Sequence, residues 1–185
     1  MKKQTGFTIL ELMTVVAIAG VLLVVAIPSY QNMIKNNCMT TGVNSLVTSL
    51  QQARSEAVKR HTTVTLTAGN ATDNTNEWGT GWNVTLKEDR NGNGTLETGE
   101  DYNGNGTLDN AVLIRSVSLT CNKTTIDETA NTTTFTYDAT GTVDKTGTFK
   151  VCDDRTAEDG REVSLSITGR PNSKVLTQSD PDKCN

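Results

Sequence analysis

This sequence is poor in the side chains on which most catalytic sites depend. Aromatic residues make up 4% of its 185 residues, and His61 is the one histidine. No cysteine or serine motif surrounds His61, which we interpret as a surface residue at the entry to a strand. The sequence also lacks a nucleophile elbow, a phosphate-binding loop and a metalloprotease motif. We therefore predict that the chain is not an enzyme.

Basic residues are outnumbered by acidic ones. The chain has 17 Lys and Arg against 21 Asp and Glu, a formal net charge of −4 at pH 7. General binding to a polyanion requires Lys and Arg gathered on one face. The acidic balance argues against that function. The abundance of Thr, Asn, Asp and Gly instead suits a β-rich extracytoplasmic domain with long polar loops.

The N-terminus combines a short basic leader with a long apolar run. Residues 1–6 include Lys2 and Lys3, and residues 7–27 are mostly apolar and carry one charge, Glu11. At roughly 1.5 Å per residue, a helix over 7–27 would be about 31 Å long, enough to span a membrane. The two lysines would keep the leader cytoplasmic. No small-x-small cleavage site follows the apolar run, so this is not an ordinary secretory signal.

Glu11 is the unusual residue of this segment. A carboxylate at mid-depth in a membrane costs roughly 2–3 kcal/mol and therefore usually has a partner. One partner would be the N-terminal ammonium of a neighbouring subunit, exposed by cleavage before Phe7. The alternative is a plain signal anchor that tolerates an acid near the interface.

The order Gly6, Phe7 and then Glu11 inside an apolar run resembles the N-terminal signature of type IV pilins and pseudopilins. The resemblance implies that a prepilin peptidase cuts after Gly6 and methylates Phe7, and that Glu11 guides assembly. It also implies a single-pass inner-membrane protein with a periplasmic head, which later joins a pilus on the cell surface. Cleavage would leave 15 basic against 21 acidic residues, because Lys2 and Lys3 leave with the leader.

Two hydrophobic periods follow the apolar run. Apolar residues recur at helical spacing at Val43, Leu46, Val47, Leu50, Ala53, Ala57 and Val58. From His61 the period is two, and strands are expected at 64–66, 82–86, 112–119, 135–137, 147–151 and 163–167. The sequence predicts an α+β fold. A long N-terminal stem helix over 7–60, membrane-spanning over 7–27, packs on an antiparallel β head over 61–185, as in pilins.

Later motifs resemble the GspH/FimT group of pilins. They are Ala53-Arg-Ser-Glu-Ala57, Trp78-Gly-Thr-Gly-Trp82, Phe149-Lys-Val-Cys152, residues 163–171 and a near-terminal cysteine. The resemblance implies a minor type IV pilin at or near the pilus tip, assembled with other pilin subunits and serving adhesion, motility or pilus assembly. The alternatives are a minor pseudopilin of type II secretion and a DNA-binding minor pilin for natural transformation.

Four cysteines, Cys38, Cys121, Cys152 and Cys184, suggest disulfides in an extracytoplasmic head. Four cysteines allow three pairings, and their spacing does not choose among them. We favour Cys152 with Cys184, which would fasten the polar C-terminal segment to the head and leave Cys38 for Cys121. No Cys-x-x-Cys pair exists, which argues against a zinc site or a redox motif.

An Asp/Asn/Gly insert over residues 89–109 repeats with a period of twelve. Its first unit has the order of a calcium loop, with oxygen donors at Asp89, Asn91, Asn93, Thr95, Glu97 and Glu100. Two of the early donors are neutral Asn, so we expect a dissociation constant of ~0.1–1 mM. The alternative is a solvated Asn-Gly loop, because such dipeptides form turns readily.

The second unit offers Asp101, Asn103, Asn105 and Asp109 but has Val112 at the twelfth place. It is either a half-site, or Asp101 and Asp109 complete the first site.

Arg170 is a second candidate binding residue. In pilins of DNA uptake that the chain resembles, a Gly-Arg-x-Arg motif near the C-terminus contacts DNA. Here Arg170 matches the first arginine, but Asn172 replaces the second. The alternative is a turn after a strand, with Arg170 solvated or paired with an acid. DNA is therefore an unfavoured partner.

Overall fold

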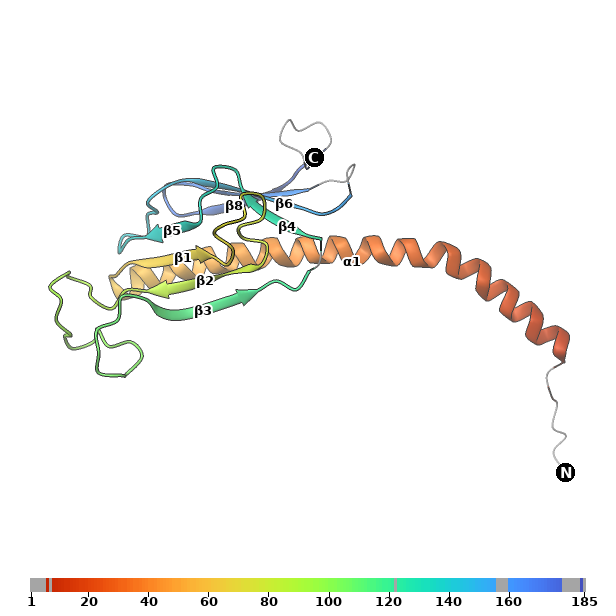
Figure 1. The fold of residues 1–185 in the computed structure, drawn as a ribbon, viewed down its shortest axis with the longest axis horizontal. Coiled ribbons are helices and arrows are strands. Elements are labelled where there is room, and N and C mark those ends of the chain that lie inside the picture. Colours follow the sequence, from red (N-terminus) through yellow and green to blue (C-terminus); the bar gives the residue numbers. More distant parts are fainter. Residues whose placement is uncertain (1–5, 7, 122, 156–159, 178–183, 185) are drawn as a thin grey trace, which may run out of the picture. The chain divides into compact units, whose positions relative to one another are not determined.

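The computed structural model describes residues 6, 8–121, 123–155, 160–177 and 184 (Figure 1). The chain divides into two compact units, Met1–Asn37 and Cys38–Asn185. One helix, α1 (Ile9–Arg60), belongs to both units.

In the first unit, α1 exposes a continuous apolar surface. Leu10, Val16 and Leu23 are each more than half exposed, as are most of their apolar neighbours. Among the described residues, α1 is the one helix long and apolar enough to cross a membrane. It continues through Pro28 without ending. Such a surface requires lipid or another protein around it, because exposed apolar patches of this size are unfavourable in water.

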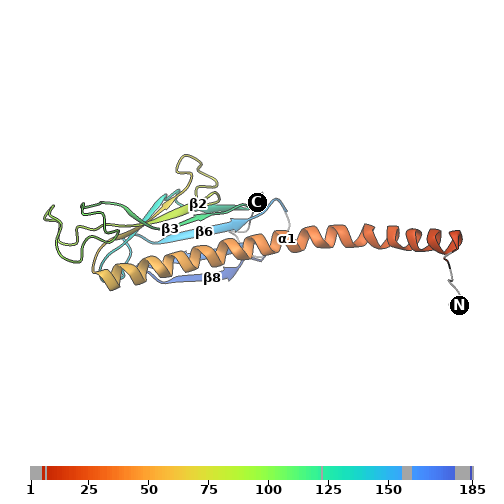
Figure 2. The ribbon, with the colours of Figure 1, turned by 90° about the horizontal axis from the view of Figure 1, so that it is seen from below.

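The second unit contains two four-stranded antiparallel sheets, of order β3-β2-β1-β5 and β4-β6-β7-β8 (Figures 1 and 2). The strands are β1 (Val64–Ala68), β2 (Gly81–Leu86), β3 (Val112–Ser118), β4 (Thr125–Glu128), β5 (Thr134–Tyr137), β6 (Gly147–Cys152), β7 (Arg161–Leu165) and β8 (Pro171–Val175). Neither β4 nor β8 was expected from the sequence. The strand predicted over 163–167 instead ends at Leu165, and Ile167 lies in the following turn.

The core forms where one face of α1 meets both sheets. Leu46, Leu50, Ala53 and Ala57 are fully buried, in one cluster with the inward side chains of β1, β2, β6 and β7. The predicted helical stripe is therefore confirmed at these positions. It is wrong at Val58, which is 42% exposed because it lies about 100° around the helix from Ala57.

Three aromatic rings join the two sheets in this core. Trp78 packs on Phe135 of β5 at 5.8 Å and edge-on against Phe149 of β6 at 5.2 Å between ring centroids. Phe135 and Phe149 are 5.3 Å apart. The indole Nε1 of Trp78 donates to the carbonyl of Thr132 at 2.9 Å, so its polar group is satisfied inside the core.

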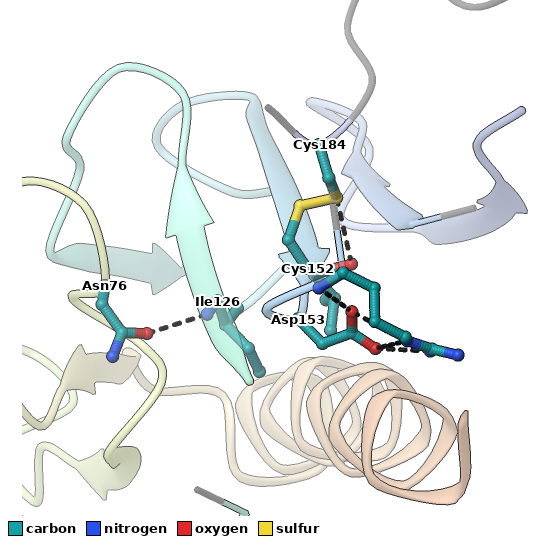
Figure 3. The surroundings of a disulfide bond; sticks show 7 residues. Asn76, Ile126, Cys152, Asp153 and Cys184 are labelled. Atoms are coloured by element: carbon teal, nitrogen blue, oxygen red, sulfur yellow. Dashed lines mark hydrogen bonds and ion pairs between the residues drawn. A yellow bond between two sulfur atoms is a disulfide. The ribbon is translucent and has the colours of Figure 1, made fainter. Parts of the chain in front are cut away.

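Two disulfides fasten peripheral segments to the second unit. Cys38 of α1 pairs with Cys121, which follows β3, and Cys152 of β6 pairs with Cys184 (Figure 3). The Cα separations are 5.8 and 5.7 Å, within the usual range for disulfides. This is the pairing that the sequence analysis favoured.

The connection between β1 and β2 lies against the outer edge of β4, the first strand of the second sheet. The backbone N–H of Ile126 donates to Asn76 Oδ1 at 2.9 Å (Figure 3), and the N–H of Trp78 donates to the carbonyl of Ile126 at 3.1 Å. Glu77 and Glu128 are buried at this contact. The loop that joins two strands of the first sheet thereby exchanges hydrogen bonds with the edge strand of the second sheet. These bonds connect the two sheets.

Asp127 of β4 lies close to the carboxyl of Glu77. Its Oδ1 is buried and receives no hydrogen bond from a donor among the described residues. Burial, followed by the neighbouring Glu77 carboxyl, raises the pKa of Asp127 to about 6, while Lys150 opposes the shift. Two adjacent carboxyls share a hydrogen bond only when one of them is protonated.

We predict that Asp127→Asn stabilises the protein at pH 7.5. The folded pKa lies above the unfolded value of about 3.9, so the folded state binds more protons between these values. The contribution of Asp127 to stability therefore falls as pH rises from about 4 to about 6. Denaturant unfolding of the detergent-solubilised chain should find the variant more stable than the wild type at pH 7.5. Near pH 4 this gain in stability should be smaller. Asp144→Asn, at a surface pair with Lys145, is the control. A variant that is less stable at pH 7.5 would contradict this account.

Candidate functional site

Glu11 forms a capping box with Thr8 at the start of α1. Glu11 Oε2 accepts the backbone N–H and the hydroxyl of Thr8 at 3.0 and 3.1 Å, and the backbone N–H of Glu11 donates to Thr8 Oγ1 at 3.2 Å. Such reciprocal bonds satisfy donors that a helix N-terminus leaves unpaired. Among the described residues, Thr8 is the one partner of the Glu11 carboxylate. This Thr-x-x-Glu pattern is visible in the sequence but was not predicted to form a cap.

The residues expected at the processing junction are only partly described. Gly6 is exposed and precedes the helix. Phe7, the expected site of methylation, lies outside the described residues. The assignment of both residues therefore remains a prediction.

The first unit of the acidic insert is a series of side-chain oxygens that accept backbone N–H groups. The carboxylate of Asp89 accepts those of the two following glycines at 2.6 and 3.2 Å. Asn91 and Asn93 each accept the N–H two residues ahead, at 3.0 and 2.8 Å, the second being that of Thr95. Their side-chain amides both donate to Glu97, at 3.2 and 2.8 Å. The expected donors thus gather in one loop.

The second unit repeats these contacts. Asp101 accepts three backbone N–H groups at 2.7, 3.1 and 2.9 Å. Asn103 and Asn105 donate to Asp109 at 2.9 and 2.8 Å. The carboxylates of Asp101 and Asp109 thus bond within their own repeat, and the suggestion that they complete the first unit stays a prediction.

The acid missing from the twelfth place of the second unit is replaced by Glu88. In the first unit, Glu100 accepts the backbone N–H groups of the second and ninth loop residues, at 3.1 and 3.0 Å. In the second unit, Glu88 accepts those of Tyr102 and Asp109, again the second and ninth, at 2.7 and 2.8 Å. Glu88 and Glu100 are 1% and 3% exposed. The two glutamates hold equivalent positions in the two loops.

Glu88 was not predicted, because a repeat counted from Asp89 leaves it outside. A signal was present, since Glu-Asp-x-Asn-Gly-Asn-Gly-Thr-Leu begins at Glu88 and again at Glu100. Counted from the glutamate, each repeat contributes the acid that closes the other one.

The insert offers calcium a suitable type of ligand. Its polar side chains at the expected positions all present oxygen, which this hard cation prefers. In the part of the chain that is described, however, no group of three or more His, Cys, Asp or Glu is arranged to hold a metal ion. Lys87 and Arg90 lie 3.9 and 3.8 Å from the carboxylates of Asp89 and Glu100.

The insert also contacts the C-terminal end of α1. The guanidinium of Arg60 lies 3.9 Å from the ring centroid of Tyr102 in the second repeat. A cation over an aromatic face is an attractive contact.

Arg170 is exposed in the turn between β7 and β8, next to buried Gly169. Gly169 has φ +72°, and its carbonyl accepts the Tyr137 hydroxyl at 3.2 Å. A β-carbon on Gly169 would collide with the Tyr137 ring and with the carbonyl of Gly141. The turn that carries Arg170 is therefore held in place by the close packing of Gly169 against Gly141 and Tyr137. Asn172, the residue in place of a second arginine, is exposed on β8.

Two family models match the chain. The model of the prokaryotic N-terminal methylation motif matches residues 1–27, which include Gly6, Phe7 and Glu11. The model described as type II transport protein GspH matches residues 42–169, from the second part of α1 to the turn after β7.

Known proteins similar to this chain are pilus proteins. Two fimbrial proteins of Pseudomonas aeruginosa are each 45% identical over 58 residues, 31% of this chain and 37% of theirs, so the match spans little more than a third of these relatives. Two crystal structures of the type IV minor pilin FimU of Pseudomonas aeruginosa PAO1 superpose with TM-scores of 0.58 and 0.54. They are 24% identical and cover 83% and 79% of this chain and 99% of their own. At this identity the likeness establishes the fold.

We predict that Gly169→Ala destabilises the protein by about 1–3 kcal/mol, because it adds a collision to an unfavourable positive φ. Gly104→Ala is a matched control, since Gly104 has φ +73° but open space around its Cα. It should lose less stability in denaturant unfolding. Equal losses in the two variants would show that the Tyr137 and Gly141 contacts are unimportant.

Proposed function

This chain belongs to the family of the type II transport protein GspH, and on that premise we propose that it is a minor subunit of a type IV pilus. The supporting observation is that an N-terminal methylation motif over 1–27 and a GspH match over 42–169 occur in one chain. The fold, shared with a minor pilin, agrees with this function.

The proposed path begins in the inner membrane. A prepilin peptidase removes residues 1–6 after Gly6 and methylates Phe7. The apolar surface of α1 holds the subunit in the membrane until other pilin subunits replace the lipid around it. The head lies in the periplasm, where an oxidising environment suits the two disulfides. The assembled subunit then reaches the cell surface at or near the pilus tip.

We propose that the capping box prepares Glu11 for assembly. Thr8 holds the carboxylate at the first turn of α1, near the end that cleavage exposes. There it can meet the ammonium of a neighbouring subunit's N-terminus. An ion pair in a low-dielectric environment is strong when both charges are satisfied and costly when one is left alone.

A second candidate is a minor pseudopilin of type II secretion, because the family to which the chain belongs is that of a type II transport protein. The gene neighbourhood distinguishes the two functions. Other minor pilin genes beside this one favour a pilus, whereas a secretin operon with exoproteins favours secretion.

We predict that Glu11→Ala leaves the subunit inserted and cleaved but lowers its recovery in sheared pili at least about tenfold, since an unmatched charge in the membrane costs roughly 2–3 kcal/mol. Immunoblots of membrane and pilus fractions measure both quantities. Thr8→Val is the comparison, because it keeps the carboxylate and removes the hydroxyl that positions it, so its recovery should fall by less than that of Glu11→Ala. Normal incorporation of Glu11→Ala would contradict the pairing.

We also propose that the insert binds calcium, with one ion in each repeat. The first set is Asp89, Asn91, Asn93, the carbonyl of Thr95, Glu97 and Glu100. The second is Asp101, Asn103, Asn105, the carbonyl of Thr107, Asp109 and Glu88. The support is the equivalence of Glu88 and Glu100, which gives both loops an acid at the place that calcium loops require. Calcium would draw these oxygens away from the backbone N–H groups and stiffen the insert.

We predict that calorimetric titration of the detergent-solubilised chain finds two calcium ions, and that 10 mM calcium stabilises it by about 1.4 kcal/mol per site if the dissociation constant is ~1 mM. Glu88→Gln and Glu100→Gln should each reduce the stoichiometry to one. Magnesium should do much less, because it tolerates many-ligand loops badly. Glu162→Gln, at the Lys174 pair on the second sheet, is the control. No heat and an unchanged melting temperature would leave only the turn interpretation.

A further inference from the structure

A groove of about 910 Å³ opens on the second unit between α1 and the turn after β7. Arg54, Lys59 and Arg170 line it, together with uncharged residues that include Gln51, Ser55 and Thr140. Among the described residues, no acidic side chain lines the groove. Three cations thus converge from two elements that lie far apart in the sequence.

These three cations are unpaired within the described region of a unit that is acidic overall. From Cys38 to the C-terminus the sequence has 14 basic and 20 acidic residues. Seven cations of the described region pair with a carboxylate: Arg60, Lys87, Arg90, Lys123, Lys145, Arg155 and Lys174. Within the same region, Arg54, Lys59 and Arg170 form no ion pair.

The acids closest in sequence to the groove are already engaged. Glu56 bonds to Arg60 at 2.6 Å, on the same helix as Lys59. Asp138 accepts bonds from the hydroxyls and backbone N–H groups of Thr140 and Thr142, which lower its pKa to about 2. Asp138 keeps its negative charge, but it is one carboxylate beside three cations, so the groove retains a net positive charge.

The floor of the groove is rigid. Arg54 Nε donates to the carbonyl of Gly141 at 3.0 Å, which fixes the guanidinium against the loop after β5. Gly141 in turn packs against Gly169, and Tyr137 bonds to the Gly169 carbonyl. Burial raises the pKa of Tyr137, so its hydroxyl stays neutral and adds no negative charge. Arg54 is thus preorganised and loses little side-chain entropy when it binds a ligand.

We infer that this groove is a docking site for a carboxylate-bearing peptide segment of a neighbouring pilin subunit. Charge complementarity calls for an anionic occupant. The groove is also partly apolar, because Val58 lines it and is 42% exposed. A peptide can present an acid beside an apolar side chain, whereas a nucleic acid presents a row of phosphates that needs a longer track of cations. The net negative charge of the unit also disfavours a long polyanion such as a nucleic acid, which would extend beyond the groove.

The identity of the occupant as a pilin rests on the proposed function, but the binding of an acidic peptide does not. The test therefore uses the purified, detergent-solubilised chain in the absence of a fibre. A failure to enter pili, as expected for Glu11→Ala, would leave this test unaffected.

The probe is a fluorescent hexaglutamate peptide, followed by anisotropy at low and physiological salt. It should bind the wild type, and Lys59→Gln/Arg170→Gln should weaken binding at least about tenfold, because two exposed unpaired charges are lost. Binding should also weaken with salt. Hexaglutamine should not bind. Lys145→Gln/Lys174→Gln, which removes two paired surface cations, should bind as the wild type does.

Two results would overturn the inference. The first is equal hexaglutamate binding by the wild type and the groove variant. The second is a single-stranded hexanucleotide that binds more tightly than hexaglutamate and loses its affinity in the groove variant, which would assign the groove to nucleic acid. Arg54→Gln is a second, independent variant for the binding measurement. It should also weaken peptide binding, in a protein whose melting temperature confirms that it is folded.

Discussion

The burial of one stripe of α1 is the interaction on which the second unit depends. Leu46, Leu50, Ala53 and Ala57 are wholly covered by the inner faces of both sheets. Burying a leucine side chain contributes roughly 1.5–3 kcal/mol, and the two alanines complete the buried stripe. Without this stripe the two sheets would expose their apolar faces, and the aromatic cluster between Phe135 and Phe149 would lose its support.

Much of this architecture is predictable because two periodicities are unambiguous in the sequence. The apolar spacing from Val43 to Ala57 fits a helix that is buried on one face. Strands such as β2 and β6 alternate buried and less buried residues, as expected for one face on a core. The N-terminal motif is equally easy to recognise in the sequence, because a lone acid such as Glu11 is rare in an apolar run.

Two kinds of feature were not predicted. In one, a buried polar side chain stabilises the fold through hydrogen bonds; in the other, the alternation of apolar and polar residues is weak. β8 begins with Pro171 and exposes four of its five residues, so it lacks alternation and lies at a sheet edge, where proline is tolerated. In β4 one inward position is Glu128, whose buried carboxylate accepts backbone N–H groups that an apolar residue could not. Glu88 was missed for a related reason, since its contacts join repeats that only the fold brings together.

The acidic insert leaves and re-enters the sheet at one point. The backbone N–H of Glu88 donates to the carbonyl of Asp109 at 3.0 Å, just beyond the Leu86–Val112 pair of β2 and β3. The entropy of closing this loop is therefore offset by strand pairing that exists without it. The insert is therefore a long loop that connects the two paired strands of a β-hairpin, β2 and β3. A loop of this kind can change in length or sequence between related subunits without altering the strand pairing or the packing of α1 on the sheets.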